Sequence, residues 1–149
     1  MKRSTNPRSF LTPNQSAAVA DAIAAAERRT SAEIKLILVR HCWSDICAKA
    51  EHIFRKHGLH NTKARNAVLI LLVTTNREFI IYGDQGIHER VGQDFWDDVR
   101  DGMAERFRLN QFAEGLCEAV GRIGEKLAAH FPWTETDENE IPDAVDMEK

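Results

Sequence analysis

The chain has 149 residues, of which 43% are hydrophobic and 29% charged, and this composition excludes a disordered or fibrous protein. Its length is that of a single domain, because domains typically have about 100 to 200 residues. The formal net charge of -3 argues against a surface that binds nucleic acid. Three cysteines are too few for a disulfide scaffold, which indicates a reducing compartment.

The first elements read as a helix followed by a buried strand. Thr12 and Gln15 can form a capping box around Pro13, so a helix begins there and runs to about Arg28. In residues 33–41, both sets of alternating side chains are largely apolar, which predicts a strand that is covered on both faces.

A second helix and two further strands follow. Ser44 or Asp45 can cap the helix, and Gly58 is suited to end it in a left-handed conformation. Residues 67–73 form a continuous apolar run with the length of a buried central strand. Residues 78–82 form a third strand, which we expect to be antiparallel to the second because the turn between them is too short for a crossover.

The remaining elements are helical. Residues 83–86, with a glycine at each end, break the third strand and precede a brief helix over 87–91. An amphipathic helix spans residues 94–108, and Asn110 caps a last helix that ends at Phe131-Pro132. Three glycines of this last helix are interpreted as points of close packing on a neighbouring element: Gly115, Gly121 and Gly124.

This order predicts an α/β protein, a three-layer α/β/α sandwich with a small mixed sheet. The first two strands are joined by a right-handed helical crossover and are therefore parallel. We divide the chain into a flexible N-terminus over 1–9, a domain over 10–132 and an acidic tail over 133–149. The tail has seven acidic residues against one lysine, and such a segment cannot bury enough apolar surface to fold alone.

Polar residues from three strands meet at one predicted edge of the sheet. Because the third strand runs against the first two, its C-terminal end lies beside their N-terminal ends, and Glu33, Asn66 and Asp84 share that edge. Their oxygens suit calcium or magnesium, with Asp84 as the first candidate ligand and catalytic residue. Alternatively, Asp84 only stabilises its own turn. Four more residues fall at the same edge: Thr30, Ser31, Thr62 and Arg65.

Other clusters have less functional promise. Trp96 lies beside the apolar stripe of its helix, where it either covers the core or walls a pocket. Four aspartates form an acidic face of that helix, which is either a solvated surface favoured by the helix dipole or a second metal shell: Asp94, Asp97, Asp98 and Asp101. Four residues have the ligand types of zinc, but the two cysteines belong to different elements, so we expect no zinc site: His41, Cys42, Cys47 and His52.

Six short segments stand out for their order along the chain: Thr30-Ser31-Ala32-Glu33-Ile34, Arg65-Asn66-Ala67-Val68-Leu69, Tyr82-Gly83-Asp84-Gln85-Gly86-Ile87, Phe95-Trp96, Gly115-Leu116 and His130-Phe131-Pro132. In this order they resemble the TPM-domain family, and residues 139–145 resemble the tail of its short members. The resemblance spans about residues 10–145 and implies an α/β/α sandwich. Family members include a thylakoid-lumen protein described as an acid phosphatase and bacterial proteins with reported divalent-metal binding.

Two functions follow from the residues and the resemblance. The first is a TPM-like domain that binds a divalent cation, calcium or magnesium rather than zinc, with phosphatase-like hydrolysis of a phosphate ester. The second is a non-catalytic module that recruits a protein partner in envelope or membrane-protein maintenance. No apolar run approaches the roughly 20 residues of a membrane-spanning helix. We expect a monomeric cytoplasmic protein that reaches membranes through partners and binds no nucleic acid.

Overall fold

The computed structural model describes residues 4–133 and 146–148. Their elements are, in chain order, α1 (Pro13–Glu27), β1 (Glu33–Val39), α2 (Ile46–Lys56), the 3-10 turn η1 (Leu59–Asn61), β2 (Ala67–Val73), β3 (Phe79–Gly83), α3 (Gln85–His88), α4 (Gln93–Arg108), α5 (Phe112–His130) and β4 (Asp146–Glu148). The strand order across the sheet is β3-β2-β1-β4. β1 is parallel to β2 and β4, whereas β2 and β3 are antiparallel. The α/β class and the mixed sheet are confirmed.

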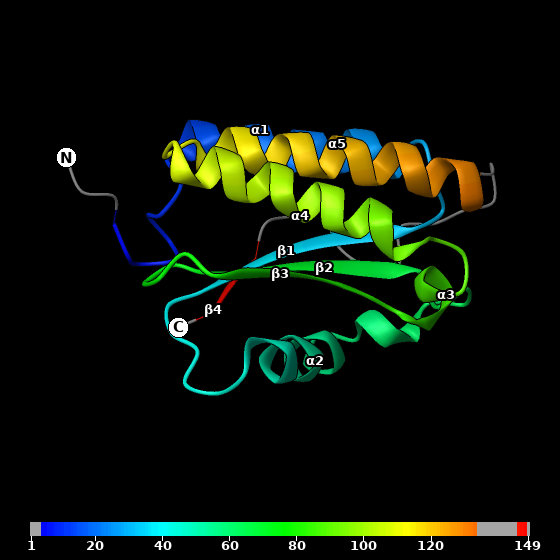
Figure 1. The fold of residues 1–149 in the computed structure, drawn as a ribbon, viewed down its shortest axis with the longest axis horizontal. Helices are drawn as coiled ribbons and strands as arrows, with labels where there is room; N and C mark the ends of the chain where they lie inside the picture. The colour runs from blue at the N-terminus through cyan, green and yellow to red at the C-terminus, as the bar shows by residue number, and fades with distance from the viewer. Residues whose placement is uncertain (1–3, 134–145, 149) are drawn as a thin grey trace.

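Helices lie on both faces of the sheet (Figure 1). Every residue of β1 and β2 is buried, and successive side chains point to opposite faces. Leu36 and Leu38 belong to the larger hydrophobic cluster, which includes side chains of α1, α4 and α5. Ile37 and Val39 belong to the smaller cluster with α2. Burial on both faces explains why these two strands read as nearly continuous apolar runs.

The predicted helix ends are mostly confirmed. Thr12 and Gln15 form the capping box of α1, with N···O distances of 3.1 and 3.0 Å between the amide of one residue and the side chain of the other. Asp45 caps α2 by accepting from an amide one turn later. Gly58 follows α2 with a φ of 69°, the left-handed conformation that glycine adopts without strain.

The prediction that Asn110 caps the last helix is wrong, because Asn110 instead closes α4. It has a φ of 61°. Its amide donates to the carbonyl of Phe107 at 3.0 Å, and the amide of Gln111 donates to the carbonyl of Arg106 at 2.9 Å. These two bonds form a Schellman motif, in which asparagine is one of the few residues that tolerate the left-handed position.

Close packing of α5 involves two of its three glycines. A Cβ atom on Gly124 would lie 2.6 Å from Cβ of Ala26 in α1, and one on Gly115 would lie 3.0 Å from Cβ of Arg106 in α4. A Cβ atom on Gly121 would meet nothing within 4 Å, because this residue is on the exposed side of the helix. The close-packing interpretation is therefore wrong for Gly121.

Both ends of the described chain are attached to the sheet or to the residue that follows it. β4, which the sequence analysis does not predict, pairs in parallel with residues 37–39 of β1. Near the N-terminus, Pro7 is buried and the hydroxyl of Thr74 donates to the carbonyl of Thr5. Residues 134–145, and with them the resemblance at 139–145, lie outside the described residues. The division at residues 9 and 132 stays a prediction. None of the described helices is long and apolar enough to cross a membrane.

Candidate functional site

The sheet edge predicted from the strand directions is present in the structure. β1 begins at Glu33, which pairs with Ala67 of β2, and Asn66 immediately precedes that pair. β3 ends just before Asp84, whose amide donates to the carbonyl of Ala67 at 3.0 Å. Glu33, Asn66 and Asp84 therefore lie at the same end of three adjacent strands.

All three residues are buried, with exposed fractions of 5% for Glu33, 2% for Asn66 and 6% for Asp84. A buried polar group costs free energy unless it is hydrogen-bonded or paired with a charge. Asn66 is held through its backbone amide, which donates to the Thr62 hydroxyl at 3.2 Å, and through its side-chain amide, which donates to the Ser31 hydroxyl at 3.4 Å. Three of the predicted edge residues thus form one polar network.

Asp84 is fixed by a charged partner and by its own helix. Arg65 donates from Nε to one carboxylate oxygen at 2.6 Å and from Nη2 to the other at 2.8 Å, which is a bidentate ion pair. The amide of Gln85 donates to the same carboxylate at 2.8 Å, so Asp84 caps α3. Hydrogen bonding to Asp84 raises the pKa of Arg65. The turn-stabilising role of Asp84 is confirmed, and its role as a metal ligand stays a prediction.

The backbone around Arg65 brings its guanidinium to Asp84. Arg65 has a φ of 50°, and its carbonyl accepts from the amide of Gly86 at 2.9 Å. A Cβ atom on Gly86 would lie 2.2 Å from the carbonyl oxygen of Ala64 and 2.7 Å from that of Arg65. Only glycine permits this approach of α3 to the start of β2. The predicted break at 83–86 is shorter in the structure, because Gly83 is the last residue of β3 and α3 spans Gln85–His88 and not 87–91. The tight junction between the two elements brings Asp84 and Arg65 together.

Lys35 is a buried charged residue that the sequence analysis does not single out as functional. It is 3% exposed and lies two residues after Glu33 in β1. Alternation along the strand places Glu33 and Lys35 on the same face of the sheet, the face that carries α2. In the sequence, the sign that Lys35 is unusual is that it is a single cation within a run of apolar strand residues. Lys35 is thus a second basic residue near this edge, in β1, whereas Arg65 precedes β2.

Tyr82, the residue before the last of β3, is a half-buried ionisable group close to the edge. Its ring contacts that of Phe54 in α2, with the centroids 5.1 Å apart. Burial raises the pKa of Tyr82, and the negative charges of Glu51 and Asp84 raise it further. The phenol is therefore protonated at neutral pH.

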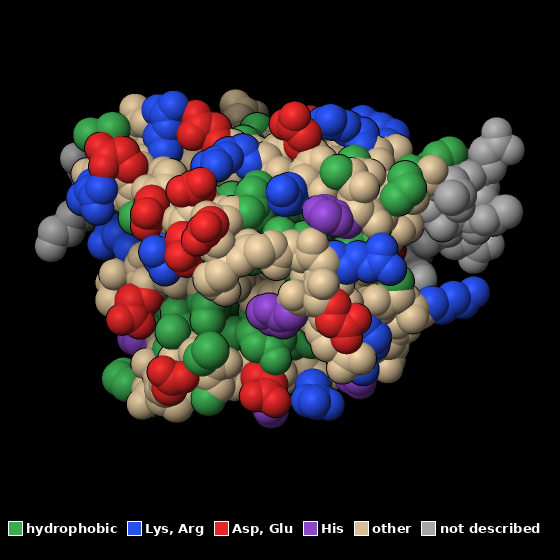
Figure 2. Space-filling view, turned by 45° about the vertical axis from the view of Figure 1, so that its right-hand side comes forward, with side chains coloured by type: hydrophobic (Ala, Val, Ile, Leu, Met, Phe, Trp, Pro, Cys, Tyr) green, Lys and Arg blue, Asp and Glu red, His purple; other side chains and the backbone are tan. Residues whose placement is uncertain are grey.

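Two of the four aspartates on the acidic face of α4 form ion pairs with an arginine of the same helix. Arg100 lies 3.3 Å from a carboxylate oxygen of Asp97 and 3.3 Å from one of Asp101, and all three side chains are substantially exposed. Figure 2 shows acidic and basic side chains interspersed over one face of the molecule. Trp96 packs against the larger hydrophobic cluster and forms an edge-on pair with Phe95, 5.1 Å between centroids. Of the two interpretations of Trp96, the core-covering one is confirmed.

The side chains that usually ligate metals are dispersed over the described part of the chain. In residues 4–133 and 146–148, no three His, Cys, Asp or Glu side chains could together hold a metal ion. The ring of His41, one of the four zinc-type residues, stacks on Trp43 at 4.8 Å. A cation at the sheet edge would rely on Glu33 and Asp84 together with amide and backbone oxygens, which is a donor set that suits hard cations and not zinc.

Comparison with known proteins supplies the family. The model of the TPM domain matches residues 4–126, which cover every element from α1 to most of α5. The chain belongs to the TPM domain family. It is similar to BA42 from the psychrophilic bacterium Bizionia argentinensis, whose NMR structure superposes with a TM-score of 0.90 at 34% sequence identity and covers 97% of this chain and 100% of BA42.

A more distant structure shares the fold of this TPM domain. The N-terminal domain of a P. gingivalis protein, also solved by NMR, matches with a TM-score of 0.68 at 20% identity, over 81% of this chain and 78% of that one. None of the curated proteins matches the chain. The TPM resemblance stated from the six sequence segments is confirmed.

Proposed function

We propose that this TPM domain, a three-layer α/β/α sandwich, binds a divalent cation, calcium or magnesium, at the sheet edge. The observation that carries the proposal is the burial of two carboxylates and one amide, those of Glu33, Asp84 and Asn66, at the same end of three adjacent strands. Calcium and magnesium take oxygen ligands of these types, and backbone carbonyls at the strand ends can complete the coordination.

Arg65 sets the condition for binding. Its guanidinium engages both carboxylate oxygens of Asp84, so a cation that binds Asp84 competes with it and, in this proposal, displaces it. The side chain of Arg65 is 37% exposed and that of Asp84 only 7%, so the guanidinium can move into water while the carboxylate stays in place. Replacement of Arg65 by a divalent ion keeps the buried carboxylate compensated, which a buried charge requires.

Hydrolysis of a phosphate ester is the chemistry that such a site supports. A divalent ion polarises a phosphoryl oxygen and activates water when it is bound. In this proposal Asp84 is the catalytic residue, because it would ligate the ion at which the phosphate ester reacts. The displaced guanidinium of Arg65 is then free to pair with the phosphate, for which its planar fork is suited.

Titration of the full chain with calcium, magnesium and zinc chloride, followed by amide NMR, tests the binding. We expect shifts at residues 65–67 and 83–87, at lower concentrations of calcium or magnesium than of zinc. Asp84→Asn and Glu33→Gln should each weaken binding, because each removes a charged oxygen ligand. Asp101→Asn, which neutralises an exposed acid of α4, is the matched control and should bind like the wild type. Saturating calcium and magnesium without shifts at 83–87 would contradict the proposal.

Phosphate release from a generic ester tests the hydrolysis separately. We expect weak, cation-dependent release by the wild type and none by the double variant Glu33→Gln, Asp84→Asn. Equal activity of the two proteins would assign the release to a contaminant or another site. Cation binding without any release would leave a binding domain and remove the phosphatase role.

A second candidate function is a non-catalytic module that recruits a protein partner, and Trp43 favours it. Trp43 is 90% exposed and lies in the loop after β1, at the other end of that strand from Glu33. An exposed tryptophan is a typical anchor of a protein interface. Crosslinking in a cell extract separates the two functions. A partner lost with Trp43→Ala and kept with Asp84→Asn supports the module, and identical crosslinks in both variants contradict it.

A further inference from the structure

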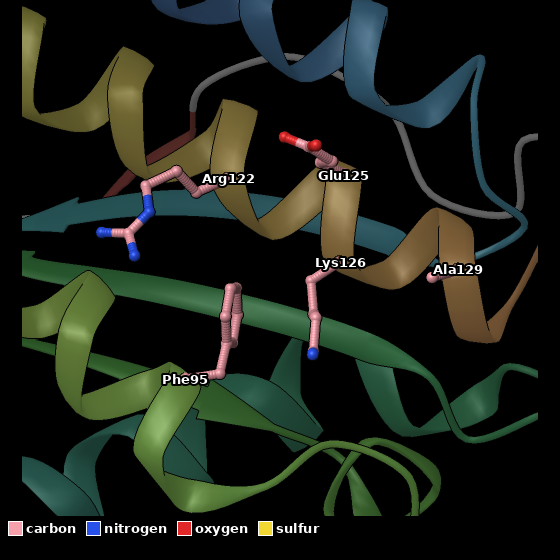
Figure 3. A pocket seen from close by; sticks show the side chains of 5 residues that line it. All are labelled: Phe95, Arg122, Glu125, Lys126 and Ala129. Carbon is pink, nitrogen blue, oxygen red and sulfur yellow. The ribbon is translucent and has the colours of Figure 1, made fainter.

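A groove between α4 and α5 has no part in the proposed cation site. It is about 300 Å³ in volume and is lined by Phe95 of α4 and by Arg122, Glu125, Lys126 and Ala129 of α5. In Figure 3 the side chains of Arg122 and Lys126 extend from α5 toward the side where Phe95 lies, whereas Glu125 points away from that ring. The volume is at the lower end of the roughly 300 to 1,000 Å³ of small-molecule sites.

The two cations of the groove have no carboxylate partner among the described residues. Arg122 donates from Nη1 to the backbone carbonyl of Asp98 at 3.3 Å. The ammonium of Lys126 lies 5.5 Å from the centre of the Phe95 ring. The neighbouring arginines differ, because each forms an ion pair with an aspartate or a glutamate: Arg100, Arg106 and Arg108.

The arrangement of Arg122, Lys126 and Phe95 suits a ligand with an anionic group and an attached apolar body. Arg122 and Lys126 are four residues apart, one turn of α5, so they lie on the same side of that helix. Phe95 is half-buried, packs against the larger hydrophobic cluster and leaves part of its ring open to the groove. An anionic group can bind between the two cations while an attached flat apolar body covers the ring.

We propose that this groove binds a small aromatic carboxylate. The carboxylate lies between Arg122, whose planar fork can donate two parallel hydrogen bonds, and Lys126. The aromatic body packs against Phe95 in an offset or edge-on geometry. An inorganic anion can pair only with the two cations, and a neutral aromatic compound can pack only against Phe95. Tight binding therefore requires a negative charge and an aromatic ring in one molecule. Because the residues are separate from those of the sheet edge, failure of either proposal leaves the other intact.

An amide NMR titration of the full chain with 2-naphthoate tests the site. Sodium acetate keeps only the charge of this probe, and 2-naphthalenemethanol keeps only its ring. We expect naphthoate to shift the amides of residues 95 and 122–129, with a dissociation constant at least fivefold below that of either control compound. The variants Arg122→Gln, Lys126→Gln and Phe95→Leu should each raise that constant about fivefold, the scale of one surface charge pair or one aromatic contact.

Lys63→Gln is the matched control, because Lys63 is an exposed lysine outside the groove. It should bind naphthoate like the wild type. A urea titration of each variant verifies that the fold is kept. The proposal is overturned if acetate binds as tightly as naphthoate, which indicates simple ion adsorption, or if 2-naphthalenemethanol does. Naphthoate shifts that persist unchanged in the double variant Arg122→Gln, Lys126→Gln also overturn it.

Discussion

The sheet edge and the α4–α5 groove hold their charges in opposite ways. At the edge, the carboxylate of Asp84 is buried and paired with Arg65. In the groove, Arg122 and Lys126 have no carboxylate partner within the part of the chain that the structure describes. A buried charge needs its partner because desolvation is otherwise uncompensated, whereas water solvates an exposed cation. In the two proposals, a cation at the edge would therefore replace Arg65 as the partner of Asp84, whereas a ligand in the groove would pair with cations that have no carboxylate partner among the described residues.

The largest effect on stability is expected from Gly86→Ala, which disrupts the tight packing at the edge. The new Cβ atom would lie 2.2 Å from the carbonyl oxygen of Ala64, so α3 must shift away from β2. We expect a loss of about 3 kcal/mol in the free energy of unfolding, the upper range for overpacking. Gly121→Ala is the control, and it should stabilise α5 by up to about 1 kcal/mol. Urea denaturation measures both, and equal stability of the two variants would contradict the comparison.

A smaller difference is expected between the charged residues of the two regions. Asp84→Ala removes the cap of α3 and a buried hydrogen-bond acceptor, and should cost about 2 kcal/mol in the free energy of unfolding. Lys126→Gln changes a surface cation without a carboxylate partner and should stay within about 0.5 kcal/mol of the wild type. Urea titrations at neutral pH measure the two values. A similar loss in both variants would show that the groove, like the edge, depends on its charge for folding.

The smallest effect concerns the pH dependence of the edge. Burial raises the pKa of Tyr82 above its ordinary value of 10.0, so the folded state retains the phenolic proton more strongly than the unfolded state does. This stabilising contribution is present below about pH 10 and is lost as the pH rises through the folded-state pKa. Tyr82→Phe should therefore show a shallower decline in unfolding free energy above pH 10. Urea midpoints between pH 8 and pH 12 measure the difference, and parallel curves would refute it.

The fold and the location of the edge could be predicted because they depend on local patterns. The apolar run at 67–73 and the short turn after it determine a buried strand with an antiparallel neighbour. That pairing, together with the parallel pairing of β1 and β2, brings Glu33, Asn66 and Asp84 to the same end of the sheet. The capping box at Thr12 is likewise encoded within four residues.

The contacts within the edge could not be predicted, because they depend on backbone conformation and tertiary packing. Arg65 reaches Asp84 from a left-handed backbone position that its side-chain type does not favour. Asn110 is suited to cap the start of α5 as well as to close the end of α4, and in the structure it closes α4.

The groove between α4 and α5 could not be predicted either. Phe95 belongs to an apolar helical stripe, and nothing in its spacing shows that its ring stays partly exposed.

The short strand β4 has a consequence for how the protein behaves at high concentration. Parallel pairing with residues 37–39 saturates part of the backbone ladder of β1, which would otherwise be available to strands of neighbouring molecules. A strand of only three residues is itself a poor template for further strand addition. We therefore expect that deletion of residues 146–148 leaves residues 37–39 of β1 unpaired on that side and favours self-association at high protein concentration.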